Sequence, residues 1–180
     1  MPCAQAPRLR FALVVFVAVS AVAPQAAAPS TERLVRAARL EDQVAEQVNL
    51  VRRSHGLAPL RESGGLAGAA RRHSRDMAVK GYFEHNSASG TAFWRRIGRS
   101  YASSGYGRWK VGENITWNTV RATAVDIVRQ WMASRAHRDN ILSGAWREFG
   151  VGAFRVPHAQ GAYGGRTVTI VTLDLGVRRR

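Results

Sequence analysis

The histidines are the side chains of this sequence best suited to chemistry, and their neighbours limit what that chemistry can be. They are His55, His73, His85, His137 and His158. Ser134 lies three residues before His137, and a serine–histidine pair can carry out nucleophilic catalysis. No G-x-S-x-G elbow surrounds this serine, and one helical turn does not build an oxyanion hole. We therefore predict that Ser134 ends a helix or hydrogen-bonds a neighbouring group.

Cysteine content and overall composition exclude several classes of protein. Cys3 is the single cysteine, so an intramolecular disulfide framework and a cysteine-rich structural zinc site are both excluded. A chain of 180 residues that is 46% hydrophobic suits one globular domain with a real core rather than a disordered protein. Only Lys80 and Lys110 are lysines, so 25 of the 27 basic residues are arginines, and the net charge is +15.

Residues 1–28 have the pattern of a secretory signal peptide. Arg8 and Arg10 precede the apolar run Phe11–Ala23, and small residues follow as far as Ala28. The apolar run is shorter than the roughly 20 residues that a transmembrane helix needs. We expect cleavage between residues 21 and 28. The product would be secreted or retained in the periplasm or cell envelope, with no transmembrane segment in the mature chain.

The rest of the chain is predicted to fold as one domain. Residues 29–38 are short, polar and basic, and we interpret them as a linker. The domain is expected over residues 39–176, and residues 177–180 are expected to form a basic tail.

Within this domain, the hydrophobic pattern predicts helices first and strands last. Helical spacing occurs between Leu40 and Gly56, between Ser63 and Gly81, over Thr91–Ser100, and in a helix capped by Asn118 or Thr119 that carries Trp131. Glu148–Val156 and Thr167–Leu175 are β-rich around a turn-like stretch, which predicts an antiparallel pair. This order indicates an α+β fold.

Several short stretches then occur in a recognisable order. They are Asn49–Arg52, His73–Met77, Tyr82–His85, Gly112–Ile115, Trp131–Ser134, His137–Leu142 and Glu148–Gly152. Each is weak alone, but the ordered set resembles the CAP superfamily of cysteine-rich secretory proteins, antigen 5 and plant pathogenesis-related proteins. The similarity is to the compact bacterial branch, also called SCP domains, and covers about residues 40–175.

The resemblance implies a three-layer α-β-α sandwich, with helices on both faces of a small antiparallel sheet. It also implies a cleft that, matched position by position, contains His85, Glu113 and His137. Many eukaryotic members have a second glutamate where this chain has Ser134. The cleft therefore has one carboxylate fewer than theirs, which counts against any mechanism that needs two.

A divalent cation such as zinc is the cofactor that the resemblance suggests, because some members hold a divalent ion on the paired histidines. Neutral imidazoles of His85 and His137 would suit this role, with Glu113 as a third ligand or as a general base. Spacing alone does not predict the site, since gaps of 28 and 24 residues (85 to 113 to 137) match no local zinc motif. The alternative is a polar cluster in which Glu113 hydrogen-bonds an imidazole.

Three tryptophans and His73 could either line the cleft or pack in the interior of the domain. Trp109 and Trp117 flank Gly112–Ile115 and could line the cleft for a lipid or other small apolar ligand, which some family members bind. Packing between helix and sheet is the alternative for both. Trp131 is expected in the core, and His73 is expected to be a packed, hydrogen-bonded helix residue.

The expected function is an exported binding module of the cell envelope or its surroundings, with enzymatic activity left open but not favoured. One alternative is a metal-dependent hydrolase with Glu113 as base and with His85 and His137 as ligands. The other is a basic protein that binds anionic envelope polymers or lipids, because a strongly positive protein is drawn to such surfaces. Nucleic acid is not the expected partner of an exported protein.

Overall fold

The computed structural model describes residues 33–119 and 121–180, so the predicted signal peptide lies outside the described residues. Five helices are present in this part: α1 (Ala38–Ser54), α2 (Gly64–Lys80), α3 (Phe93–Gly98), α4 (Ala124–Ala133) and α5 (Arg135–Leu142). Five strands accompany them: β1 (Val35–Arg36), β2 (Arg61–Glu62), β3 (Arg108–Asn118), β4 (Glu148–Ala159) and β5 (Arg166–Arg179). No helix in the described residues is both long and apolar enough to cross a membrane.

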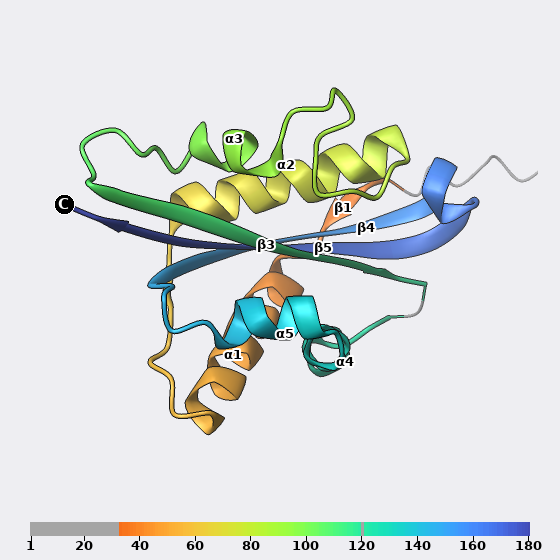
Figure 1. Cartoon of the computed structure of the whole chain (residues 1–180). Helices are drawn as coiled ribbons and strands as arrows, with labels where there is room; N and C mark the ends of the chain where they lie inside the picture. The colour runs from red at the N-terminus through yellow and green to blue at the C-terminus, as the bar shows by residue number, and fades with distance from the viewer. Residues whose placement is uncertain (1–32, 120) are drawn as a thin grey trace, which may run out of the picture. The chain divides into compact units, whose positions relative to one another are not determined.

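The strands form one sheet that is sandwiched between two layers of helices. Its order is β1-β4-β5-β3, and β2 adds a short parallel pairing to β4 while the other pairs are antiparallel. Figure 1 shows α2 and α3 on one face of the sheet, and α1, α4 and α5 on the other. The predicted three-layer α-β-α sandwich is confirmed.

Helix α2 packs unusually close to the sheet because β4 presents two glycines to it. A Cβ atom on Gly150 would lie 2.0 Å from the backbone nitrogen of Ala67, and one on Gly152 would lie 2.3 Å from the backbone of Ala70. The helix contributes small side chains at these positions. Ser74 of the same helix donates a hydrogen bond from Oγ to the carbonyl of Gly152 at 2.9 Å. This close approach brings α2, and His73 on it, next to the centre of the sheet.

The opposite face of the sheet carries most of the apolar core. Val44 and Val48 of α1, Trp131 of α4 and Ile141 of α5 are fully buried there, against Phe149 and other residues of β4 and β5. Trp131 also donates a hydrogen bond from its indole nitrogen to the carbonyl of Ile115 at 3.3 Å. The prediction that Trp131 belongs to the core is therefore confirmed.

A buried carboxylate attaches α1 to the sheet. Glu41 accepts hydrogen bonds from Arg36 (Nη2 to Oε2, 2.6 Å), Arg71 (Nε to Oε2, 2.8 Å) and the backbone nitrogen of Ala153 (3.1 Å). Burial alone would raise the pKa of Glu41, but the bonds from Arg36, Ala153 and Arg71 offset it, and the pKa is lowered. The carboxylate thus joins α1, α2 and β4 in its ionised form.

The cap of α4 differs from the prediction. Thr123 is the N-cap, and its side chain accepts from the backbone nitrogen of Asp126 while Asp126 accepts from that of Thr123, which forms a capping box. Asn118 cannot serve, because it is the last residue of β3. The β3 strand itself was not predicted. A period-two pattern that includes Val111 and Ile115 was its only signal.

Regular secondary structure extends beyond both ends of the expected range 39–176. Val35–Arg36 of the expected linker pairs with β4, and α1 already begins at Ala38. The expected basic tail continues β5 as far as Arg179, with Val177 buried and paired with Lys110. Strand pairing satisfies the backbone groups of both segments, which a count of basic residues does not reveal.

Candidate functional site

Glu113 lies at the centre of a charged cluster on the α2/α3 face of the sheet. It sits in the middle of β3, and its side chain is only 1% exposed. One carboxylate oxygen is 2.8 Å from Nδ1 of His85, and the other accepts a hydrogen bond from Arg96 of α3. His85 itself is half exposed. The predicted neighbours His85 and Glu113 are therefore brought together, with Arg96 as a third partner that the sequence did not reveal.

A second carboxyl group faces Glu113 across the ladder. Asp174 of β5 is the strand partner of Glu113 and is completely buried. Burial raises the pKa of Asp174 well above its usual value, and the negative charge of Glu113 raises it further. Burial also favours a higher pKa for Glu113, but the His85 hydrogen bond and the charge of Arg96 outweigh it and lower that pKa. The pair therefore consists of an ionised Glu113 and a protonated Asp174.

His73 borders the same cluster from α2. Its Nε2 lies 3.9 Å from Glu113 and donates a hydrogen bond to the carbonyl of Glu84 at 3.0 Å. Burial lowers the pKa of His73 to about 4, so the imidazole is neutral. The prediction of a packed, hydrogen-bonded helix histidine agrees with this geometry, but its closeness to Glu113 was not predicted.

The other predicted cleft residues line a separate pocket. His137 of α5 and Ser134, which joins α4 to α5, border a pocket of about 410 Å³. His85 and Glu113 border a smaller one of about 250 Å³. Burial, followed by the charge of His85, lowers the pKa of His137. Within residues 33–119 and 121–180, the Ser134 hydroxyl forms no hydrogen bond to His137, and a nucleophilic pair has no geometric support.

Two asparagines hold α5 in place beside β3. The side-chain nitrogen of Asn114 donates to the carbonyl of His137 at 3.0 Å. Asn140 donates in turn to the side-chain oxygen of Asn114 at 2.9 Å and to the carbonyl of Glu113 at 3.2 Å. These bonds fix the backbone of His137 relative to the strand that carries Glu113.

The two tryptophans that flank the Gly112–Ile115 stretch have different surroundings. Trp117 lines the His137 pocket and packs edge-to-face on Tyr163, with ring centroids 5.5 Å apart. Trp109 instead donates from its indole nitrogen to the carbonyl of Tyr101 at 2.8 Å and packs beside α3. Trp117 is therefore a wall of the pocket, whereas Trp109 is a packing residue.

The donor set fits a three-ligand metal site poorly. Among the residues that the structure describes, no group of three or more His, Cys, Asp or Glu side chains is arranged to hold a metal ion. Both oxygens of Glu113 already accept hydrogen bonds, one of them from a guanidinium cation. A cation beside that carboxylate would face the positive charge of Arg96. His85 and His137 are the other two predicted ligands, and Nδ1 of His85 already lies 2.8 Å from Glu113.

Arg96 and Asp174 are the site residues that sequence reasoning missed. Arg96 is one of many arginines, and nothing in its local sequence distinguishes it. Asp174 had a weak signal, as a lone acid within the apolar run Thr167–Leu175. An isolated carboxyl group at a fully buried strand position needs a partner, which points to a polar cluster.

Comparisons with known proteins agree with this fold. The sequence model of the cysteine-rich secretory protein family, CAP, matches residues 45–174. The chain is 36% identical over 115 residues to the uncharacterized protein YkwD of Bacillus subtilis, covering 62% of this chain and 41% of the relative. It is 32% identical over 120 residues to the uncharacterized membrane protein YlbC of the same species, covering 67% of this chain and 33% of the relative. The chain thus spans less than half the length of either curated relative.

Solved structures extend the comparison. An extracellular protein with an SCP domain from Bacillus anthracis superposes with a TM-score of 0.60 at 25% identity, over 79% of this chain and 41% of that one. An outer surface protein of Borrelia burgdorferi gives a TM-score of 0.66 at 13% identity, over 82% and 98% of the two chains. The second likeness concerns the fold alone. Taken with the family match over residues 45–174, these results place the chain in the CAP family.

Proposed function

We propose that this protein is an exported, non-catalytic binding module whose ligand occupies the pocket beside His137. The observation that carries the proposal is the state of Glu113. Its carboxylate is buried, accepts a hydrogen bond on each oxygen and is lowered in pKa, so it is a weak general base. A metal-dependent hydrolase would need this group.

The lining of the His137 pocket favours a small, mainly apolar ligand. Phe83, Ile115 and Trp117 contribute apolar walls, and His137 and Ser134 contribute polar atoms. Its volume of about 410 Å³ lies within the range of small-molecule sites, which combine apolar walls with a few polar groups. A lipid chain or similar ligand with one polar group facing His137 would match this surface.

Two further parts of the proposal rest on different support. Export is supported by the signal-like sequence of residues 1–28 and by the likeness to an extracellular protein with an SCP domain. For a divalent cation, His85 and His137 remain the candidate ligands, without Glu113, although the two imidazoles border separate pockets in this structure. Two protein ligands are fewer than the three of catalytic zinc sites, so we assign no reaction to such an ion.

Binding of a neutral solvatochromic dye, Nile red, tests the proposed pocket. Replacing Trp117 by alanine should weaken binding about tenfold, because it removes the largest apolar wall. The matched control is Trp94→Ala, since Trp94 is 46% exposed on α3 and lines neither pocket described above. Equal effects of the two substitutions would place dye binding elsewhere. Retained binding in Trp117→Ala would reject the pocket as the ligand site.

The hydrolase alternative is tested by titrating Zn²⁺ calorimetrically into the metal-stripped protein and its His85→Ala, His137→Ala and Glu113→Gln variants. We expect any saturable site to be lost in both histidine variants and to persist in Glu113→Gln. Loss of the site in Glu113→Gln as well, with the variant folded, would make Glu113 a ligand and reopen hydrolysis.

A further inference from the structure

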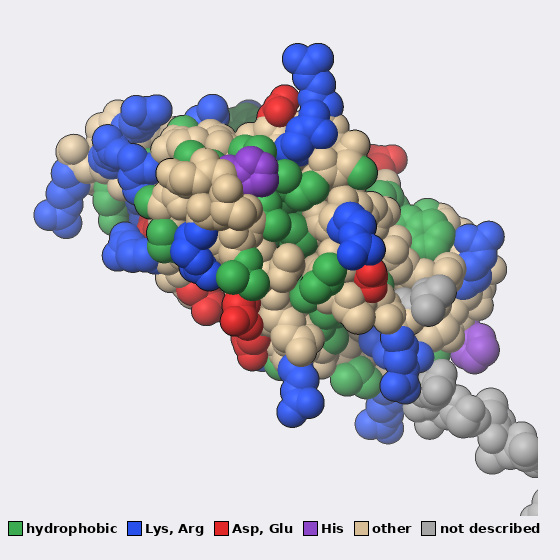
Figure 2. Space-filling view, turned by 90° about the horizontal axis from the view of Figure 1, so that it is seen from below, with side chains coloured by type: hydrophobic (Ala, Val, Ile, Leu, Met, Phe, Trp, Pro, Cys, Tyr) green, Lys and Arg blue, Asp and Glu red, His purple; other side chains and the backbone are tan. Residues whose placement is uncertain are grey.

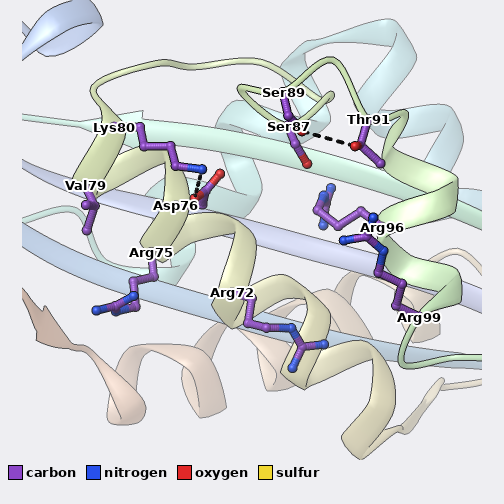
Figure 3. Close-up of a pocket in the computed structure, with 10 residues that line it drawn as sticks. All are labelled: Arg72, Arg75, Asp76, Val79, Lys80, Ser87, Ser89, Thr91, Arg96 and Arg99. Carbon is purple, nitrogen blue, oxygen red and sulfur yellow. Dashed lines mark hydrogen bonds and ion pairs between the residues drawn. The ribbon is translucent and has the colours of Figure 1, made fainter.

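A third, strongly basic pocket lies between α2, α3 and the loop that joins them (Figure 3). Its volume is about 520 Å³, and neither His137 nor Trp117 lines it. Five of its side chains are basic and one is acidic: Arg72, Arg75, Lys80, Arg96 and Arg99, with Asp76. Four arginines, Arg36, Arg39, Arg121 and Arg155, line another pocket, near the start of α1. Figure 2 shows that lysine and arginine side chains also lie on the face of α1, α4 and α5.

Internal pairing leaves part of this positive charge uncompensated. Lys80 and Asp76 neutralise each other, with Nζ 2.8 Å from Oδ1. Arg96 is already paired with Glu113. Within the described part of the chain, no carboxylate lies at ion-pair distance from Arg72, Arg75 or Arg99, and the Arg72 guanidinium donates only to the neutral hydroxyl of Ser100. Three guanidinium groups thus share one pocket without a counter-charge.

The opposite wall of the pocket carries hydroxyl groups. Ser87, Ser89 and Thr91 of the connecting loop lie there, and the hydroxyls of Ser89 and Thr91 are 3.1 Å apart. Figure 3 shows Arg96 and Arg99 extending from α3 towards α2, beneath this loop. The pocket therefore has guanidinium groups on one side and hydroxyl groups on the other.

We propose that this pocket binds a phosphate-bearing anion with more than one phosphoryl group, such as an oligophosphate or a segment of a phosphorylated polymer. Guanidinium groups bind phosphate oxygens through paired hydrogen bonds, and hydroxyls can donate to the remaining oxygens. Three uncompensated arginines match a multiply charged ligand better than a single monoanion. The volume is also that of a small-molecule site rather than of an ion site. This inference goes beyond the proposed function, because it concerns a different pocket and ligand.

The test is calorimetric titration of tripolyphosphate into the purified protein at about 0.15 M salt, where weak surface attraction is largely screened. We expect one saturable site per chain. Arg72→Gln/Arg99→Gln should weaken binding at least about tenfold, since each charge-assisted hydrogen bond contributes substantially. Arg96 is left intact, because it compensates the buried Glu113.

The matched control is Arg53→Gln/Arg95→Gln, which removes the same charge from exposed positions on α1 and α3 outside the pocket. We expect at most about a twofold change for this control. Equal weakening by both double variants, or no saturable binding to the unmodified protein, would overturn the proposal. Arg99→Lys provides a variant that keeps the charge, and a partial loss is expected because lysine lacks the planar fork.

Competition distinguishes two sources of the phosphate. Displacement of bound tripolyphosphate by vesicles of phosphatidic acid would support the site with a lipid headgroup as its ligand. Displacement by soluble oligophosphate alone would support it with a soluble ligand. Equal displacement by vesicles carrying carboxylate headgroups at matched surface charge would overturn the assignment to phosphate. Nile red binding beside His137 should be unaffected by tripolyphosphate, which separates failure of this site from failure of the proposed function.

Discussion

Glu113 and Asp174 are strand partners with opposite protonation states, and their environment explains the difference. Glu113 is bonded to Arg96 and His85, which favour its ionised form. Asp174 is completely buried, lies 4.0 Å from the nearest guanidinium nitrogen of Arg96, and faces the negative charge of Glu113. The single guanidinium group of Arg96 therefore neutralises one of two neighbouring carboxyl groups, and burial favours the protonated form of the other.

This difference predicts unequal effects of two amide substitutions. Asp174→Asn should change the free energy of unfolding at pH 7 by less than about 1 kcal/mol, because an amide replaces an uncharged carboxyl group of similar shape. Glu113→Gln should destabilise by about 3 kcal/mol, because it leaves the buried Arg96 without its ionised partner. Urea unfolding monitored by tryptophan fluorescence measures both. A larger loss in Asp174→Asn than in Glu113→Gln would contradict the assigned charge states.

At the scale of elements, the site depends on how closely helices approach the sheet. Gly150 and Gly152 permit α2 to pack directly on β4, which places His73 next to Glu113. On the other face, Asn114 and Asn140 fix α5 beside β3. The elements that carry His73, Glu113 and His137 are thus positioned by glycines and amides, while His85 and Arg96 bond directly to Glu113.

Gly152→Ala should lower the free energy of unfolding by about 3 kcal/mol or more, because the added Cβ would overlap the α2 backbone and separate helix from sheet. Gly107→Ala is the control, since nothing lies within 4 Å of its added Cβ. Chemical denaturation of the two variants compares them. If Gly152→Ala unfolded at the same urea concentration as Gly107→Ala, the result would contradict the direct packing of α2 on β4.

The attachment of α1 by Glu41 predicts a pH-dependent contribution to stability. The pKa of Glu41 is lowered in the folded state. The contribution of Glu41 to the free energy of unfolding is therefore fully present above its unfolded pKa of about 4.3, and it is lost as the pH falls through its folded pKa. Glu41→Gln should cost about 2 kcal/mol at pH 7, and the difference from the unmodified protein should shrink below about pH 4. Glu46→Gln, an exposed glutamate of the same helix, is the control. If the difference in free energy of unfolding between Glu41→Gln and the unmodified protein stayed constant down to pH 3, the Glu41 carboxylate would not attach α1 in its ionised form.

The net positive charge of the whole molecule is relevant to the surfaces that it would meet after export. The chain carries a net charge of +15, and residues 1–28 have the pattern of a signal peptide. A strongly basic protein that reaches the cell envelope meets anionic polymers and lipids there, to which it is attracted in a salt-dependent way. The basic pocket between α2 and α3 would convert part of this general attraction into recognition of a defined phosphate ligand.

Export itself is testable on the full chain. Expressed in a bacterial host, the protein should be recovered outside the cytoplasm with a new N-terminus between residues 22 and 29, because residues 1–28 have the pattern of a cleaved signal peptide. Mass spectrometry of the recovered protein identifies that terminus. Deletion of residues 11–23 should retain the product in the cytoplasm. Recovery of an intact chain that starts at Met1 from the extracellular fraction would contradict the prediction.

Local patterns in the sequence were sufficient for much of the architecture. Helical periodicity located α1, α2 and α3, and the β-rich runs located β4 and β5, because each pattern depends only on residues close in the chain. The ordered motifs were sufficient to name the family, together with His85, Glu113 and His137. The strand β3 was missed, although it carries Glu113.

The protonation states and the contacts of these site residues depend on segments that are far apart in the sequence. Arg96 lies 17 positions before Glu113, and Asp174 lies 61 positions after it (174 minus 113). Their meeting depends on the register of β3 against β5, where a slip of one residue would turn Asp174 to the other face of the sheet. It also depends on which arginine of α3 points inward. The protonation of an ionisable group depends on the charges that lie close to it in space. The sequence identifies the ionisable groups but does not show which of them lie close together.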